Sequence, residues 1–292
     1  MRLAVTIMGR NLRLFFRDRA GVAFSLLGAL IVFVLYALFL SDLQARSIAS
    51  SFPDATMSDV RAFVDTWMFA GIIAMTSSTT SLGALGVFVD DAATGRVRDF
   101  LVSPIRQWQL VLGYLLATIV VALVMTVIVL MVSLAYLFFV DGVTIGFAEV
   151  VATLVWITLS CCAFAAVWAF VASFLRTTAA FSALSTVVGT LIGFLAGAFI
   201  AVGLFPSGVR DLVNALPFAQ SAMLMRQQFT AESLTALVGD ESAATAALSE
   251  FYGITTVIGG EVVPVPVVAG LLLVYGLVFT ALAVWRIRAR IT

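Results

Sequence analysis

Six long stretches of this sequence contain no charged residue, and they limit the possible fold more than any other feature. The stretches are residues 20–41, 66–89, 107–140, 150–175, 177–209 and 262–285. Each is longer than the roughly 18 to 20 residues that an α-helix needs to cross about 30 Å of hydrocarbon. Because each stretch is continuously apolar and does not alternate with a period of two, it fits a helix and not a strand of a membrane barrel. We therefore predict an all-α integral membrane protein with six transmembrane helices.

The composition agrees with this class. Hydrophobic residues make up 62% of the 292 residues and charged residues only 11%, whereas soluble domains average about 25% charged residues. A soluble fold of this length could not bury so much apolar surface, so we expect a single transmembrane domain over residues 1–292. The stretches 107–140 and 177–209 exceed the length of one span, and we expect tilt or an interfacial turn to absorb the excess.

The arginines predict the orientation. All 16 basic residues are arginines, and twelve of them fall in the N-terminal arm, the loops between spans two and three and between spans four and five, and the C-terminal tail. The opposite loops hold the other four and most of the acidic residues. Because cytoplasmic loops are enriched in basic residues, we predict a multi-pass protein of the cell (plasma) membrane with both termini in the cytoplasm.

The N-terminal arm, residues 1–19, has the pattern of an amphipathic helix. Its apolar residues recur near helical spacing, and its arginines occupy the other side; they are Leu3, Ile7, Leu14 and Phe15 against Arg10, Arg13 and Arg17. Such a helix lies in the membrane interface, with its apolar face in lipid and its arginines near phosphates. The alternative, equally weighted from composition, is a simple basic anchor for span one.

The loop between spans two and three contains two helix breakers, Gly95 and Pro104. Between them, Val97, Phe100 and Leu101 could form the apolar face of a short cytoplasmic helix. From the residues alone, an ordinary connecting loop is the favoured interpretation. The other extramembrane piece, residues 206–261, is apolar but interrupted, and we expect short helices on or near the outer surface.

The sequence excludes several functions. It has no GxxxxGK[ST] phosphate loop, which argues against ATP binding by this chain. It has no histidine, and its two cysteines, Cys161 and Cys162, are adjacent in an apolar run, so we expect neither a metal site nor histidine-based catalysis. The absence of charge within the spans disfavours a secondary transporter or a channel with a charged ring. An apolar or amphipathic substrate, or an energy source outside this chain, fits better.

Two features within the spans are mildly polar. Span two contains six consecutive hydroxyl residues, 76–81, which either contact other helices or a cavity, or bond to their own backbone carbonyls. Span five contains Gly189, Gly193 and Gly197 with the spacing of a doubled GxxxG motif. Small residues at this spacing allow close helix approach, either within one subunit or between two.

Together these pieces resemble the membrane subunit of a type-2 ABC exporter. The resemblance covers nearly the whole chain and rests most on the loop between spans two and three, with the FFRDR end of the arm as a further sign. The family pattern there is an acidic residue, a glycine, an apolar pair, Ser-Pro-Ile and a glycine near the start of span three. This sequence has Asp90 and Asp91, Gly95, Phe100 and Leu101, Ser103-Pro104-Ile105 and Gly113. The acidic position is more often Glu in the family.

The resemblance implies specific roles for these residues. Residues 90–105 would form a coupling helix that docks on a separate cytoplasmic ATPase through Asp90, Asp91, Gly95, Arg98, Phe100, Leu101 and Pro104. The arm would be a connecting helix that also touches the ATPase, with Arg10, Arg13, Phe15, Phe16 and Arg17 as its key residues. Spans one, two and five would line an interface with a second permease copy or a similar permease, using Thr76, Thr79, Thr80, Gly189, Gly193 and Gly197.

The resemblance also implies partners. The partner ATPase would bind ATP and Mg, and this chain would hold no cofactor or metal of its own. Membrane lipid is an expected partner and nucleic acid is not. The leading hypothesis is a permease that exports a hydrophobic or amphipathic drug, lipid or peptide. The alternatives are a polysaccharide or glycolipid permease of the same family, an intramembrane lipid-modifying enzyme that uses acidic residues such as Asp90 and Asp91, and a structural or immunity-type membrane protein.

Overall fold

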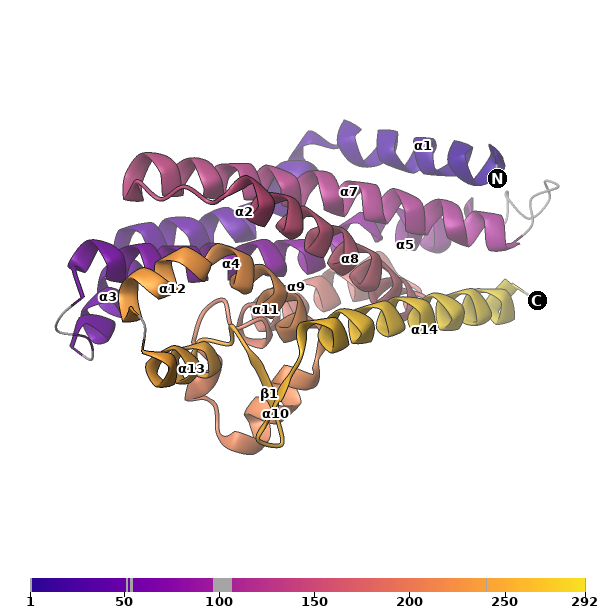
Figure 1. Cartoon of the computed structure of the whole chain (residues 1–292). Coiled ribbons are helices and arrows are strands. Elements are labelled where there is room, and N and C mark those ends of the chain that lie inside the picture. The colour runs from indigo at the N-terminus through magenta and orange to yellow at the C-terminus, as the bar shows by residue number, and fades with distance from the viewer. Residues whose placement is uncertain (1, 51, 53–54, 97–106, 240, 292) are drawn as a thin grey trace.

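Long helices make up most of the computed structural model (Figure 1), which describes residues 2–50, 52, 55–96, 107–239 and 241–291. Within this part of the chain, six helical segments are long and apolar enough to cross a membrane. They are α2–η1–α3 (Arg19–Leu35, Tyr36–Leu40 and Ser41–Ala49), α4–α5 (Met57–Ala84 and Gly86–Ala93), α7–η2 (Gln107–Tyr136 and Leu137–Asp141), α8 (Phe147–Ala172), α9 (Thr178–Leu195) and α14 (Val265–Ile291). The predicted all-α membrane class with six spans is confirmed.

Both ends of the chain lie at the same end of the bundle (Figure 1). We call this end, which also holds the junction between α5 and α7, the terminal side. The other end, which holds α3, α12 and α13, is called the opposite side. An even number of crossings requires this arrangement, because each crossing moves the chain from one side to the other.

The bundle is built around α4. Helices α2, α7, α8 and α9 all pack against it, and every residue from Phe63 to Ser78 is buried. Large side chains such as Trp67 and Phe69 fill the space between α4 and its neighbours. Spans one, five and six instead leave most of their side chains uncovered. These three spans therefore supply the surfaces that remain for lipid or for another protein.

Helix α1 (Arg2–Arg17) precedes span one and packs against α7. Its buried stripe is Ala4, Ile7 and Asn11. A Cβ at Gly113 of α7 would lie 2.7 Å from the Ile7 side chain and 3.1 Å from the Ala4 carbonyl oxygen, so the two helices touch at backbone distance. The predicted helix is present, but its buried face lies against α7 and not in lipid.

The two overlong apolar stretches follow different routes. Residues Gln107–Asp141 form one continuous helical segment of 35 residues, about 52 Å long at 1.5 Å per residue, which exceeds the hydrocarbon core. The stretch 177–209 does not continue as a helix, because α9 ends at Leu195 and Gly197 turns the chain with a φ of +63°. Gly197 therefore lies beyond the helix, and the doubled GxxxG pattern does not form one helix face.

The segment between spans five and six contains the expected short helices. They are α10 (Ser207–Ala215), α11 (Pro217–Phe229), α12 (Ala231–Val238) and α13 (Ser242–Phe251), followed by an antiparallel hairpin of β1 (Thr256–Ile258) and β2 (Glu261–Val263). Helix α11 departs from the prediction, because it does not lie on a surface. It packs against α4, α8 and α14, and its Ser221 hydroxyl lies 2.7 Å from that of Ser160 in α8.

Candidate functional site

A group of polar side chains joins three elements at the terminal side, and we call it the Asp91 cluster. The Asp91 side chain in α5 has 0% exposure. Arg10 of α1 donates to both of its oxygens, with Nη1–Oδ2 at 2.6 Å and Nη2–Oδ1 at 3.0 Å. The Tyr114 hydroxyl of α7 donates to Oδ2 at 2.6 Å, and Arg96 donates to Oδ1 at 3.0 Å. One carboxylate thus ties α1, span two and span three together.

The electrostatics of this cluster favour a fixed geometry. A bidentate arginine–carboxylate pair is among the strongest charge-assisted hydrogen bonds, and the hydrogen bonds that Arg10 donates to Asp91 raise the pKa of Arg10 above its ordinary value. Breaking a buried pair costs about 3–5 kcal/mol where the remaining charge has no other partner. Asp91 keeps Arg96 and Tyr114 if Arg10 is lost, whereas loss of Asp91 removes the acceptor of all three. Arg10 was expected near lipid phosphates, and the structure places it on Asp91 instead.

The acidic pair predicted at the start of the coupling helix belongs to span two. Asp90 and Asp91 lie in α5, which continues to Ala93, and the Thr94 amide still donates to the Asp90 carbonyl at 2.9 Å. Gly95 follows with a φ of +79°, which is consistent with its predicted role as a helix breaker. The predicted helix over 90–105 therefore does not begin at Asp90.

Several predicted docking residues can be placed and others cannot. Arg98, Phe100, Leu101 and Pro104 lie outside the described residues. Phe15 of α1 packs beside Val121 and Met125 of α7. Arg13, Phe16 and Arg17 are exposed, and the Arg13 Nε donates to the Gly9 carbonyl of its own helix at 3.2 Å. The exposed arginine face of α1 is thus the part of the arm that remains available to a partner.

Most hydroxyls of residues 76–81 in span two form hydrogen bonds within their own helix. Five of the six hydroxyls donate to backbone carbonyls three or four residues earlier, as for Thr76 to Ile72 at 2.7 Å and Thr80 to Thr76 at 2.6 Å. The sixth, Ser78, accepts from the Trp168 indole of α8 at 3.0 Å. Thr76 and Thr80 are buried, so of the three predicted interface threonines only Thr79 reaches a surface.

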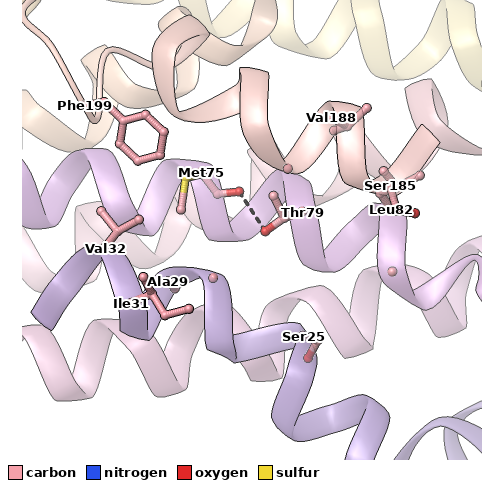
Figure 2. A pocket seen from close by; sticks show the side chains of 13 residues that line it. Ser25, Ala29, Ile31, Val32, Met75, Thr79, Leu82, Ser185, Val188 and Phe199 are labelled. Atoms are coloured by element: carbon pink, nitrogen blue, oxygen red, sulfur yellow. Dashed lines mark hydrogen bonds between the residues drawn. The ribbon is translucent and has the colours of Figure 1, made fainter. Parts of the chain in front are cut away.

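That surface is a cleft of about 390 Å³ between α2, α4 and α9, which we call the α2–α4–α9 cleft. It lies between spans one, two and five, the three spans that were expected to line an interface. Its lining is uncharged and consists of Ser25, Gly28, Ala29, Ile31, Val32, Met75, Thr79, Leu82, Gly83, Ser185, Val188, Gly189 and Phe199. Figure 2 shows Met75 and Thr79 in its middle, with Phe199 and Ser25 toward opposite ends.

Glycines and hydroxyls give the cleft its character. Gly28, Gly83 and Gly189 come from three different spans, and a Cβ at any of them would meet no atom within 4 Å. The Ser185 hydroxyl is buried and has no hydrogen-bond partner among the residues described. The cleft can therefore hold a neutral, largely apolar group and offer it a hydrogen bond. Gly189 is the predicted glycine that lies here, whereas Gly193 is covered by the ring of Phe199.

A family model for ABC-2 family transporter proteins matches residues 41–285. The chain belongs to this family. No curated protein matches the chain. The match covers spans two to five, nearly all of span six, and α3 of span one, but not α2 or η1. It makes the chain the membrane subunit, or permease, of an ABC transporter. An ABC-2 permease of this kind works with an ABC ATPase subunit.

Two buried charges of this ABC-2 permease were missed by sequence reasoning. Asp65 was assigned to a loop, but α4 begins at Met57, and Asp65 is buried within it, with the Ser41 hydroxyl donating to it at 2.6 Å. Arg226 was counted as a loop arginine, but it is 1% exposed in α11. The apolar residues directly before it, Met223 to Met225, were the sequence signal that could have indicated its burial. The interior of the bundle therefore contains charged residues, and the family match is what shows that the chain is a permease.

Proposed function

We propose that this permease exports a hydrophobic or amphipathic substrate, such as a drug, lipid or peptide, with ATP and Mg bound by a separate ATPase. The observation that carries the proposal is the α2–α4–α9 cleft. Its volume falls within the about 300–1,000 Å³ that is usual for small-molecule sites. Its lining contains no charged side chain, so it suits a neutral or amphipathic molecule better than an ion.

A second permease copy, or a similar permease, would complete this path. Spans one and five flank the cleft and leave most of their side chains uncovered. The exposed residues of α9 include small and hydroxyl side chains such as Ser182, Thr186 and Gly189, which favour close helix contact in lipid. Substrate would then pass along the interface between the two permeases.

Coupling to the ATPase would use the terminal side. The positive-inside rule places this side in the cytoplasm of a cell with the permease in its plasma membrane. The Asp91 cluster fixes α1 to the ends of spans two and three, directly beside the loop that the family resemblance assigns to ATPase docking. A push on either α1 or that loop would therefore reach span two, which borders the cleft.

The alternatives fit the site less well. A polysaccharide path would be rich in aromatic side chains, but among the side chains described Phe199 is the single aromatic one that lines this cleft. An intramembrane enzyme would need a free carboxylate near the membrane face, but Asp91 already accepts four hydrogen bonds from three residues.

The proposal is tested by efflux of a hydrophobic fluorescent dye from cells that express the permease with the ATPase encoded beside it. Gly189→Leu should lower ATP-dependent efflux roughly tenfold or more, because the new side chain fills space in the cleft. Gly270→Leu in α14 is the matched control, since Gly270 also has no atom near its Cβ position but lies outside the cleft. Equal efflux by both variants, or efflux without any ATPase, would refute the proposal.

A further inference from the structure

The chain segment directly after α9 is a buried turn, residues 196–199, which we call the α9 turn. The Ala198 and Phe199 amides both donate to the Gly193 carbonyl, at 2.8 and 3.1 Å. This closes the turn from the amide side. The carbonyls of the turn have no helical partner, as is usual where a helix ends, and the backbone at Ala196 and Ala198 is buried.

Two side chains from other parts of the chain satisfy these carbonyls. Arg226 Nη2 of α11 donates to the Ala196 oxygen at 3.0 Å and to the Gly197 oxygen at 2.7 Å. The Tyr36 hydroxyl of span one lies 3.1 Å from both the Ala198 and the Phe199 oxygens and shares its proton between them. All four carbonyls thus depend on side chains of α11 and span one. Unsatisfied carbonyls at membrane depth would cost several kcal/mol.

The surroundings of Arg226 show that its charge serves this turn and not a bound anion. Among the described residues, no carboxylate forms an ion pair with it, and its guanidinium lies 5.1 Å from the centre of the Trp67 ring. Cβ atoms built at Gly71 and Gly253 would lie 3.2 and 3.0 Å from its nitrogens. The backbone at both glycines therefore lies close to the guanidinium. The negative end of the α9 dipole is the counter-charge that remains.

The other face of the α9 turn borders the α2–α4–α9 cleft. Phe199 lines the cleft, and its ring occupies the place where a side chain on Gly193 would lie. Figure 2 shows Phe199 at one end of the cleft, beyond Met75 and Val32. The turn that Arg226 and Tyr36 hold is therefore the segment that sets the position of Phe199.

We infer that Arg226 and Tyr36 are positioning residues that hold the α9 turn, so that Phe199 closes one end of the cleft. Opening of that end requires the hydrogen bonds from Arg226 and Tyr36 to the turn to rearrange. The inference rests on the proposed function in one respect: closing the cleft matters only if the cleft is the substrate path. The hydrogen bonds themselves and the placement of Phe199 do not depend on it.

The test measures the accessibility of position 199 to a membrane-impermeant maleimide. Phe199→Cys is introduced into the full chain with Cys161→Ala and Cys162→Ala, and labelling is followed in intact cells and in inverted vesicles. The cysteine replaces the ring, so its labelling rate reports how firmly the turn holds position 199 and not closure by the ring. With Arg226 and Tyr36 intact, the turn is held and buried, and labelling should be slow from both sides. Tyr36→Phe should raise the labelling rate from one side about fivefold, and Arg226→Gln about tenfold or more, as expected for loss of neutral and charged hydrogen bonds.

Matched controls separate positioning from general destabilisation. Tyr275→Phe removes a hydroxyl that donates to the Ala215 carbonyl at 3.1 Å, and Arg210→Gln removes an arginine that pairs with Glu250 at 3.1 Å. Neither touches the α9 turn, so neither should change the labelling rate at position 199. A reporter at the exposed residue Ser207 should label equally in all backgrounds.

Unchanged labelling at position 199 in both Tyr36→Phe and Arg226→Gln, with both variants folded, would overturn the inference. A thermal shift without a change in accessibility would do the same, because it would reduce both residues to a structural role. If Arg226→Gln does not fold, Tyr36→Phe alone decides. The labelling needs neither ATPase nor substrate, so its outcome is independent of the efflux experiment on which the proposed function stands or falls.

Discussion

Two regions of the bundle hold an arginine in different ways. At the terminal side, Arg10 meets a carboxylate, Asp91, and keeps 30% of its side chain exposed. Beside the α9 turn, Arg226 is 1% exposed, and among the described residues its guanidinium donates to backbone carbonyls and lies over an aromatic ring. An arginine paired with a carboxylate ties two helices together. An arginine on the carbonyls at a helix end fixes the direction in which the chain leaves that helix.

This difference predicts different responses to substitution. The Asp91 cluster shares one buried carboxylate among Arg10, Arg96 and Tyr114, so loss of the carboxylate removes every pairing at once, whereas loss of one arginine leaves the other in place. The α9 turn has a single charged group, so its loss leaves only neutral carbonyls without a donor. The terminal side should therefore respond most to removal of its shared acceptor.

The largest effect is expected for Asp91→Ala. It leaves the Arg10 and Arg96 charges and the Tyr114 hydroxyl without their acceptor, and should lower the free energy of unfolding by about 3–5 kcal/mol. Arg10→Ala should cost less, about 1.5–3 kcal/mol, because Arg96 and Tyr114 still serve Asp91. Unfolding of the purified permease in detergent measures both. The double variant should cost less than the sum, and additive costs would contradict the shared cluster.

An intermediate effect is expected for Gly113→Val. Helix α1 crosses Gly113 at backbone distance, so a side chain there should push α1 away from α7 and cost about 1–3 kcal/mol. Gly9→Ala in α1 is the control, because a Cβ at Gly9 meets no atom within 4 Å. It should be neutral or stabilise the helix by up to about 1 kcal/mol. Protease sensitivity of the arm reports its release, and equal sensitivity of the two variants would argue against this packing.

The smallest effect is expected for Arg61→Gln at the opposite side. Arg61 pairs with Asp42 at 2.7 Å, but both side chains are about half exposed, at 53% and 54%. Exposed pairs of this kind contribute about 0–1 kcal/mol, and solvent and salt screen them. This variant gives the baseline value of an exposed arginine that is paired with a carboxylate. A loss as large as that of Asp91→Ala would remove the distinction drawn between buried and exposed arginines.

The spans could be predicted because the bilayer imposes one simple requirement on them. A stretch such as 150–175 needs only continuous apolar residues, and the structure places α8 at Phe147–Ala172. The same rule failed for 177–209, because apolarity does not show where a helix ends. A positive φ at Gly197 ends it, and the supporting side chains are distant in sequence.

The site could be predicted only in outline. Thr79 and Gly189 were expected at an interface and do meet in the cleft. The partners of Asp91 were missed, because Arg10 and Tyr114 lie 81 and 23 residues away along the chain. Residues 206–261, which include α11, were expected on or near the outer surface because the segment is too interrupted and charged to span. Arg226 of this helix is buried and donates to backbone carbonyls of the α9 turn. No local sequence pattern predicts that contact, because the turn lies about 30 residues earlier in the chain.

The buried position of α4 has a consequence for how the protein enters the membrane. Among the described residues, its segment has the lowest mean hydropathy of the six candidate spans and the largest buried share. When span two emerges from the ribosome, span one has already been synthesised, but α7, α8 and α9, which later pack against it, have not. Its hydroxyls are sheltered at that moment by bonds to their own carbonyls, which lowers the cost of meeting lipid. Span two should therefore insert stably only once α7, the most apolar span, follows it as the second arm of a helical hairpin.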